Sequence, residues 1–111
     1  MAATSGEGDA TVEELKQRLD GKEDLFILDV RQPEEFQICR IPGSKLIPLA
    51  ELPQRVGELQ KDRELIVHCK SGMRSLKATK FLRDAGFKRA RNLKGGILAW
   101  AQKIDPTMPT Y

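Results

Sequence analysis

The segment from Leu65 to Ser75 constrains the fold of this 111-residue chain more than any other. It reads LIVHCKSGMRS, so a short apolar run is followed by Cys69, a small polar loop and the start of a periodic segment. An apolar run of this kind is typical of a strand that is buried on both faces of a parallel sheet. We therefore expect a strand that delivers Cys69 into a loop, and a helix that follows the loop directly.

The rest of the chain alternates between strand and helix patterns. The expected strands are 25–30, 45–49, 65–68 and 90–93, and the expected helices are 12–19, 33–36, 52–59, 74–85 and 96–103. Thr11 and Glu14 form a capping box, Pro33 occupies a first helical turn, and Gly86 ends a helix. This alternation indicates an α/β fold, an open and mostly parallel sheet of about five strands with helices on both faces.

The length and composition fit one domain with a modest core. Residues 1–10 are small and polar and are expected to form a disordered leader or a linker remnant, with the folded domain at 11–111. Two cysteines and one histidine are too few for a structural zinc site or a disulfide framework. No stretch suits a membrane span or a signal peptide, so a reducing cytoplasm is the expected compartment.

Cys69 is the candidate nucleophile, because a helix start carries free N–H groups and the positive end of the helix dipole. The cradle expected for an anion consists of Lys70, Ser71, Gly72, Met73, Arg74 and Ser75. Small and flexible residues let successive N–H groups turn toward one centre, and Gly72 permits a backbone angle that other residues resist. The structural alternative is a buried, inert thiol.

This loop resembles the active-site loop of rhodanese-type sulfurtransferases. Other segments are similar to the family in the same order, namely Asp29-Val30-Arg31, Glu35-Phe36, Ile41-Pro42-Gly43-Ser44 and the ending Asn92-Leu93-Lys94-Gly95-Gly96-Ile97 with Trp100. The resemblance extends from about residue 25 to residue 100. It implies the rhodanese fold and a sulfurtransferase that carries sulfur as a persulfide on Cys69, with no metal, flavin or nucleotide as cofactor.

Around Cys69, several side chains have two possible roles. Arg74 either bonds the loop carbonyls and holds a substrate oxyanion, which we favour, or is solvated, and Lys70 either touches an anionic donor or faces water. Asp29 and Arg31 are expected to form an ion pair that supports the site, with Glu35 as a further partner of Arg31. 

Two residues near these motifs are expected to be structural. Successive strand residues point to opposite faces, so His68 is directed away from Cys69 and is not expected to act as its base. Cys39 and Arg40 stand where many rhodaneses have Gly-His. A second thiol could resolve a persulfide, but nothing around Cys39 resembles an activated cysteine.

Three other functions agree less well with the sequence. A rhodanese-like phosphatase or arsenate reductase has the loop form C-x5-R, whereas Cys69 and Arg74 here give C-x4-R. A non-catalytic binding module commonly lacks the cysteine. Nucleic-acid binding is not expected, because the basic residues come without interleaved aromatics or an RNA-binding motif.

The charge is unevenly distributed along the chain. Residues 1–64 contain 9 basic and 14 acidic side chains, whereas residues 65–111 contain 10 basic and 2 acidic ones. Basic character beside an anion-binding loop favours an anionic substrate or an acidic protein partner.

Two segments, 37–49 and 104–111, resemble the C-terminal rhodanese domain of adenylyltransferase–sulfurtransferase fusions. This resemblance implies a cysteine desulfurase or thiosulfate as donor and an acidic ubiquitin-like sulfur carrier as acceptor. The carrier is adenylated by an E1-like domain in cis, and its thiocarboxylate serves pathways such as molybdenum cofactor biosynthesis. The alternative is a stand-alone thiosulfate sulfurtransferase.

Overall fold

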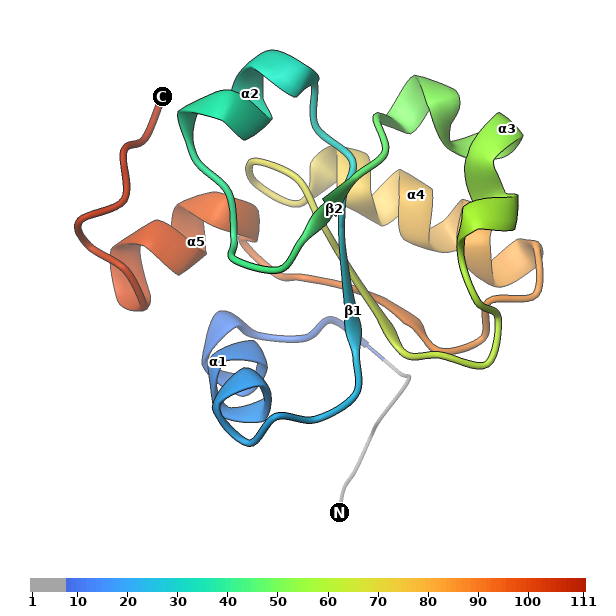
Figure 1. Cartoon of the computed structure of the whole chain (residues 1–111), viewed down its shortest axis with the longest axis horizontal. Helices are drawn as coiled ribbons and strands as arrows, with labels where there is room; N and C mark the ends of the chain where they lie inside the picture. The colour runs from blue at the N-terminus through green and yellow to red at the C-terminus, as the bar shows by residue number, and fades with distance from the viewer. Residues whose placement is uncertain (1–7) are drawn as a thin grey trace.

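A computed structural model describes residues 8–111 as an α/β domain (Figure 1). Its α-helices are α1 (Val12–Asp20), α2 (Pro33–Ile38), α3 (Leu52–Arg55), α4 (Met73–Asp84) and α5 (Gly96–Lys103). Its strands are β1 (Phe26–Asp29), β2 (Lys45–Leu46), β3 (Leu65–His68) and β4 (Ala90–Asn92). Two 3₁₀ segments, η1 (Leu49–Glu51) and η2 (Val56–Glu58), flank α3. None of the helices in this described part is long and apolar enough to cross a membrane.

The sheet is parallel throughout, in the order β2-β1-β3-β4. It has four strands among the described residues, so the expected number of about five is wrong. The nearest approach to a fifth strand is one isolated parallel bridge between Ala10 and Leu93. A single bridged residue is too short to count as a strand.

Ala10 belongs to the folded domain, although it was expected to lie in a disordered leader. Its N–H donates to the carbonyl oxygen of Asn92, and its own carbonyl oxygen accepts from the N–H of Lys94, both at 2.8 Å. The residue is 1% exposed. The part of the expected leader at residues 1–7 lies outside the described residues.

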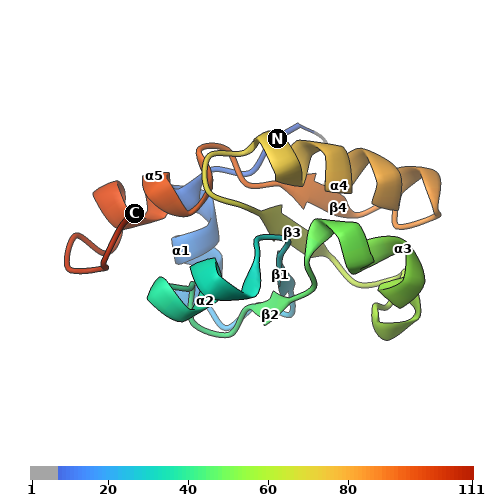
Figure 2. The same ribbon diagram turned by 90° about the horizontal axis from the view of Figure 1, so that it is seen from above.

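Helices cover both faces of the sheet, as the alternating pattern predicts (Figure 2). On one face, Leu52, Ala78 and Leu82 of α3 and α4 pack against Leu28 and Val67. On the other face, a second apolar cluster is formed by residues of α1, α5 and the strands, among them Val12, Leu15, Ile27, Ile66, Ile97 and Trp100. Trp100 of α5 is 5% exposed and belongs to this core.

Most helix ends lie within two residues of the expected ones, but the helix expected at 52–59 is broken up. Only Leu52–Arg55 is α-helical, and η1 and η2 continue it on either side. Pro53 lies in the first turn, where proline is tolerated, but Gly57 weakens the helix interior, so a long regular helix is disfavoured here.

Candidate active site

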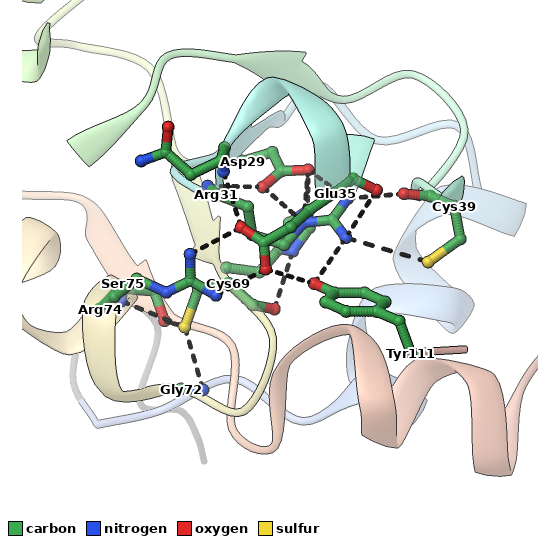
Figure 3. Close-up of polar contacts among 11 residues, drawn as sticks. Asp29, Arg31, Glu35, Cys39, Cys69, Gly72, Arg74, Ser75 and Tyr111 are labelled. Atoms are coloured by element: carbon green, nitrogen blue, oxygen red, sulfur yellow. Dashed lines mark hydrogen bonds and ion pairs between the residues drawn. The ribbon is translucent and has the colours of Figure 1, made fainter. Parts of the chain in front are cut away.

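Cys69 lies directly after β3 and before the first turn of α4, at the carboxyl edge of the sheet. Its sulfur accepts hydrogen bonds from the N–H of Gly72 at 3.1 Å and from the N–H of Ser75 at 3.4 Å. The Ser75 hydroxyl also lies 3.4 Å from this sulfur (Figure 3). Three donors therefore converge on one buried thiol, as a nest for an anion requires.

The pKa of Cys69 is below its ordinary value. Burial of the thiol is the largest influence and raises the pKa, because it disfavours the charged form. Hydrogen bonds from the Ser75 hydroxyl and from the N–H groups of Ser75, Gly72 and Ser71 act in the opposite direction and together prevail. The fold thus stabilises the thiolate without a histidine.

The loop is held from outside by the first turn of α5. The N–H of Ile97 donates to the carbonyl oxygen of Cys69 at 2.9 Å, and the N–H of Leu98 donates to that of Lys70 at 3.1 Å. Gly96 makes this approach possible, because a Cβ there would lie 2.5 Å from the Lys70 oxygen and 2.6 Å from the Cys69 oxygen. With the carbonyls fixed outward, the following N–H groups face the sulfur.

Gly72 has the backbone conformation that the sequence predicts. Its φ of 112° lies in the left-handed region, and the residue is the N-cap of α4. Residues with a Cβ adopt this angle only with strain. The left-handed conformation of Gly72 therefore directs its N–H toward Cys69 and also allows α4 to begin at the next residue.

Arg74 is bound to Glu35, not to the loop carbonyls. Its two terminal nitrogens donate to the two carboxylate oxygens of Glu35 at 2.7 and 2.9 Å. The expected bonds from Arg74 to the loop carbonyls are absent among the described residues. The expected pairing of the Glu35 carboxylate with Arg31 is also wrong, because Arg31 donates to the backbone carbonyl oxygen of Glu35. Hydrogen bonding from Arg74 lowers the pKa of Glu35 to about 2.

Asp29 and Arg31 form the ion pair that the sequence predicts. Both side chains are fully buried, and the Arg31 guanidinium contacts both Asp29 oxygens at 2.7 to 3.0 Å. Arg31 also donates to the carbonyl oxygens of Cys39 and Glu35, at 2.6 and 3.3 Å. This pair therefore ties the end of β1 to the middle and the C-terminal end of α2, which carries Glu35.

Cys39 lies at the end of α2 and is a free, buried thiol, as is Cys69. Its sulfur is 3.9 Å from a terminal nitrogen of Arg31. Figure 3 places Cys39 across the Arg31 guanidinium from Cys69. This long hydrogen bond from Arg31 is a contact with the buried Asp29–Arg31 pair, so a role of Cys39 in resolving a persulfide stays without support.

His68 points to the face of the sheet opposite Cys69. It is completely buried, its Nδ1 lies 3.4 Å from the Cys69 carbonyl oxygen, and its Nε2 lies 3.7 Å from an Asp29 oxygen. Burial, the largest influence, lowers the pKa of His68, so the ring is neutral near neutral pH. The predicted direction of the side chain is confirmed.

The remaining cradle residues lie at the rim of the site. Met73 is 74% exposed at the start of α4, and Ser71 is exposed in the loop. The ammonium group of Lys70 lies 4.5 Å from the centre of the Tyr111 ring, a cation–π contact. Lys70 thus faces the rim and is held beside an aromatic ring.

Tyr111 is a site residue that sequence reasoning missed. Its hydroxyl accepts from Arg31 at 3.0 Å and donates to Glu35 at 2.7 Å (Figure 3). These partners lie 80 and 76 residues away in the sequence. No local pattern reports such a contact, and the only signal was the resemblance of the segment 104–111 to one subgroup.

Asn92, at the end of β4, was also missed as a site residue. Its Oδ1 accepts the Ser75 hydroxyl at 2.5 Å, and its Nδ2 donates to an Asp9 carboxylate oxygen at 3.3 Å. A polar residue that ends a strand beside the catalytic strand is a usable signal, because carboxyl ends of parallel strands meet at one edge. Within residues 8–111, no group of three His, Cys, Asp or Glu side chains could hold a metal.

Comparisons with known proteins agree with this geometry. A sulfurtransferase of Allochromatium vinosum is 41% identical over 90 residues, which cover 81% of this chain and 84% of that protein. The adenylyltransferase and sulfurtransferase MOCS3 of Arabidopsis thaliana is 34% identical and matches 88% of this chain, but only 25% of its own length is covered.

A solved structure shows the same fold. The crystal structure of a thiosulfate sulfurtransferase from Pseudomonas aeruginosa superposes with a TM-score of 0.78 at 34% identity and covers 86% of this chain and 19% of that one. The family model described as the rhodanese-like domain matches residues 11–103. With a thiol cradled between β3 and α4 and a match over most of its length, this chain belongs to the rhodanese-like domain family.

Proposed function

We propose that this protein is a sulfurtransferase that carries a sulfur atom as a persulfide on Cys69. The observation that carries the proposal is the convergence of the Gly72 and Ser75 N–H groups on the Cys69 sulfur. Preorganised N–H donors stabilise an anion before and after loading, because both the thiolate and the terminal persulfide sulfur are negatively charged. Membership of the rhodanese-like family supports the same chemistry.

The proposed reaction has two displacements. The Cys69 thiolate attacks the outer sulfur of thiosulfate, so a new S–S bond forms, the old one breaks, and sulfite leaves with the electron pair. With a cysteine desulfurase as donor, the leaving group is the desulfurase thiolate. With a nucleophilic acceptor, the acceptor takes the outer sulfur in the second step and Cys69 leaves as a thiolate, so no external oxidant is needed.

The acceptor that we propose is the adenylated C-terminus of an acidic ubiquitin-like sulfur carrier, with an E1-like adenylyltransferase domain in cis. The persulfide attacks the acyl adenylate and AMP leaves, which gives an acyl disulfide on Cys69. A thiol reductant then attacks the Cys69 sulfur, releases the thiocarboxylate and forms a mixed disulfide with Cys69, and a second equivalent of the thiol reduces this disulfide to free Cys69. The name of the MOCS3 relative combines these two activities in one protein. We place the reaction in the cytoplasm, where Cys39 and Cys69 stay reduced.

The exposed side of α4 supports an acidic partner. Lys77 and Lys80 lie on it beside Met73 and Leu76, which are 74% and 45% exposed. Within the described chain neither lysine is paired with a carboxylate, whereas Arg74 is bound to Glu35. An unpaired basic and apolar strip that begins at the catalytic loop suits an acidic protein surface.

A stand-alone thiosulfate sulfurtransferase is the second candidate. The Allochromatium relative named sulfurtransferase is covered over 84% of its length, so it is of similar size to this chain. The phosphatase alternative has less support, because the Arg74 guanidinium is directed at Glu35 and is not free to bind an oxyanion in the loop.

Mass spectrometry tests the proposed function. After incubation with thiosulfate, or with a cysteine desulfurase and cysteine, the protein should gain the mass of one sulfur atom on the Cys69 peptide. Cys69→Ala should gain none, and Cys39→Ala should load like the wild type. Loading of Cys69→Ala to the wild-type extent would contradict the proposal.

A further inference from the structure

The Ser75 hydroxyl lies between two groups that compete for its proton. Its oxygen is 2.5 Å from Oδ1 of Asn92 and 3.4 Å from the sulfur of Cys69. Ser75 is fully buried, so water does not supply a substitute donor to either group. A serine hydroxyl carries one proton, and it therefore donates to only one of the two at a time.

The orientation of the Asn92 amide is set at its other end. Its Nδ2 donates to a carboxylate oxygen of Asp9 at 3.3 Å. An ionised carboxylate only accepts, so the NH₂ side of the amide faces Asp9 and the oxygen faces Ser75. The Asp9 backbone is held by Arg91, whose guanidinium donates to the Asp9 carbonyl oxygen at 3.4 Å. 

These contacts have opposite consequences for the two states of Cys69. When the thiol is protonated, the Ser75 proton goes to the nearer Asn92 oxygen, and the Ser75 oxygen can accept from the S–H group. When the sulfur becomes an anion, the hydroxyl turns to it and leaves the buried Asn92 oxygen without this donor. The loss of a hydrogen bond to a buried carbonyl is unfavourable.

We propose that Asn92 is a positioning residue that competes with Cys69 for the Ser75 proton and so restrains ionisation of the resting thiol. The inference rests on the proposed function only in taking Cys69 as the reacting group. Of the other charged or titratable side chains around the site, Arg74 is paired with Glu35 and His68 lies beside Asp29.

The test is the rate at which iodoacetamide alkylates Cys69 at pH 6, followed by mass spectrometry of the Cys69 peptide. Asn92→Ala frees the Ser75 proton for the sulfur and should raise the rate by about threefold to tenfold. Asp9→Ala frees the amide to rotate and should raise the rate in the same direction by less. A rate that is unchanged or lower in both variants overturns the proposal.

The Ser75→Ala background separates this relay from other effects. Removing Asp9 also removes a negative charge, which favours an anion with or without Ser75. In Ser75→Ala, which should itself react more slowly, addition of Asn92→Ala should no longer accelerate alkylation. Acceleration that persists in this background contradicts the relay. Asp9 is exposed, so if Asn92→Ala does not fold, the test is whether Asp9→Ala accelerates alkylation more in the presence of Ser75 than in the Ser75→Ala background.

Alkylation needs no sulfur donor, so its outcome is independent of persulfide formation. A protein in which Asn92→Ala accelerates alkylation but thiosulfate never loads Cys69 would retain the inference and refute the proposed function. A protein that loads sulfur on Cys69 but shows no effect of Asn92→Ala would support the proposed function and refute the inference.

Discussion

At the scale of single residues, the site depends on bonds between side chains and backbone that hold charges in place. Cys69 is stabilised as an anion by N–H donors, and each such bond to a charged group is stronger than one between neutral groups. Arg74 and Glu35 neutralise each other beside the loop, and Tyr111 bonds the same carboxylate. The positive charge of Arg74 is thus fixed at the rim.

Glu35→Gln tests the pair between α2 and α4. The wild-type pKa of Glu35 is lowered to about 2 by its bond with Arg74. The pair therefore stabilises the fold fully at pH values above 4.5, the ordinary pKa of the group, and this stabilisation is lost as the pH falls toward 2. Denaturant unfolding at pH 7 should show a loss of about 1–2 kcal/mol in the free energy of unfolding.

This loss should shrink between pH 4.5 and 2, because the wild-type carboxylate is being protonated there. Glu34→Gln is the matched control, since Glu34 is exposed and precedes Glu35 in α2. A constant difference between wild type and Glu35→Gln down to pH 2 would contradict the assigned pair.

Tyr111→Phe tests the tyrosine hydroxyl separately from its ring. The change removes the bonds to Arg31 and Glu35 but keeps the ring beside Lys70. We expect a loss of about 1 kcal/mol in the free energy of unfolding, and a larger loss for Tyr111→Ala. Equal stability of wild type and both variants would show that the segment does not dock on the site.

At the scale of elements, the cradle is made by three segments that meet at one edge of the sheet. β3 delivers the thiol, α4 begins beneath it, and the first turn of α5 binds the carbonyl oxygens of Cys69 and Lys70. The sequence predicts the first two, because a strand, a glycine and a helix follow one another directly. It does not predict the third, since the contact of α5 with the loop depends on the tertiary arrangement.

Gly96→Ala tests the contact of α5 with the loop. The new Cβ would lie 2.5 Å and 2.6 Å from two backbone oxygens, and the φ of 59° is strained for alanine. Thermal and denaturant unfolding should show a loss of about 2–4 kcal/mol, and persulfide loading should slow by about tenfold or more because the cradle is displaced.

Gly57→Ala is the matched control, because a Cβ there meets no atom within 4 Å. It should leave the free energy of unfolding unchanged or slightly higher. Equal behaviour of the two alanine variants would refute the role assigned to Gly96.

At the scale of the whole molecule, local patterns predict what depends on neighbours in sequence. Apolar runs locate β1 and β3, the Thr11 cap starts α1, and the alternation of strands and helices gives a parallel sheet covered on both faces. The expected number of about five strands was wrong, because Ala10 makes only a single bridge with Leu93 in the place of a fifth strand. The contacts of Arg74 and Tyr111 with Glu35 join segments that are far apart in the sequence. Neither hydrophobic periodicity nor a helix-capping pattern predicts such contacts.

The distribution of charge over the molecule leads to a prediction about the partner. Replacing Lys77 and Lys80 by glutamine should slow sulfur transfer to an acidic ubiquitin-like carrier by about threefold or more and weaken its dependence on salt. Loading from thiosulfate should change much less. Stopped-flow or quenched transfer assays at two salt concentrations measure both steps.

The matched control replaces Lys22 and Lys88 by glutamine. These exposed lysines precede β1 and β4, so they lie toward the amino edge of the sheet, away from Cys69. An equal effect of the two double variants would indicate attraction by net charge alone and would contradict docking on α4.

The central claim is that the fold lowers the pKa of the Cys69 thiol below its ordinary value. The most direct measurement is the alkylation rate of Cys69 in the wild-type protein as a function of pH, followed on its own peptide so that Cys39 does not contribute. Because the loop N–H groups lower its pKa, the rate should reach half its plateau at a pH below the ordinary pKa of a cysteine thiol. A midpoint at or above that ordinary value would contradict the account.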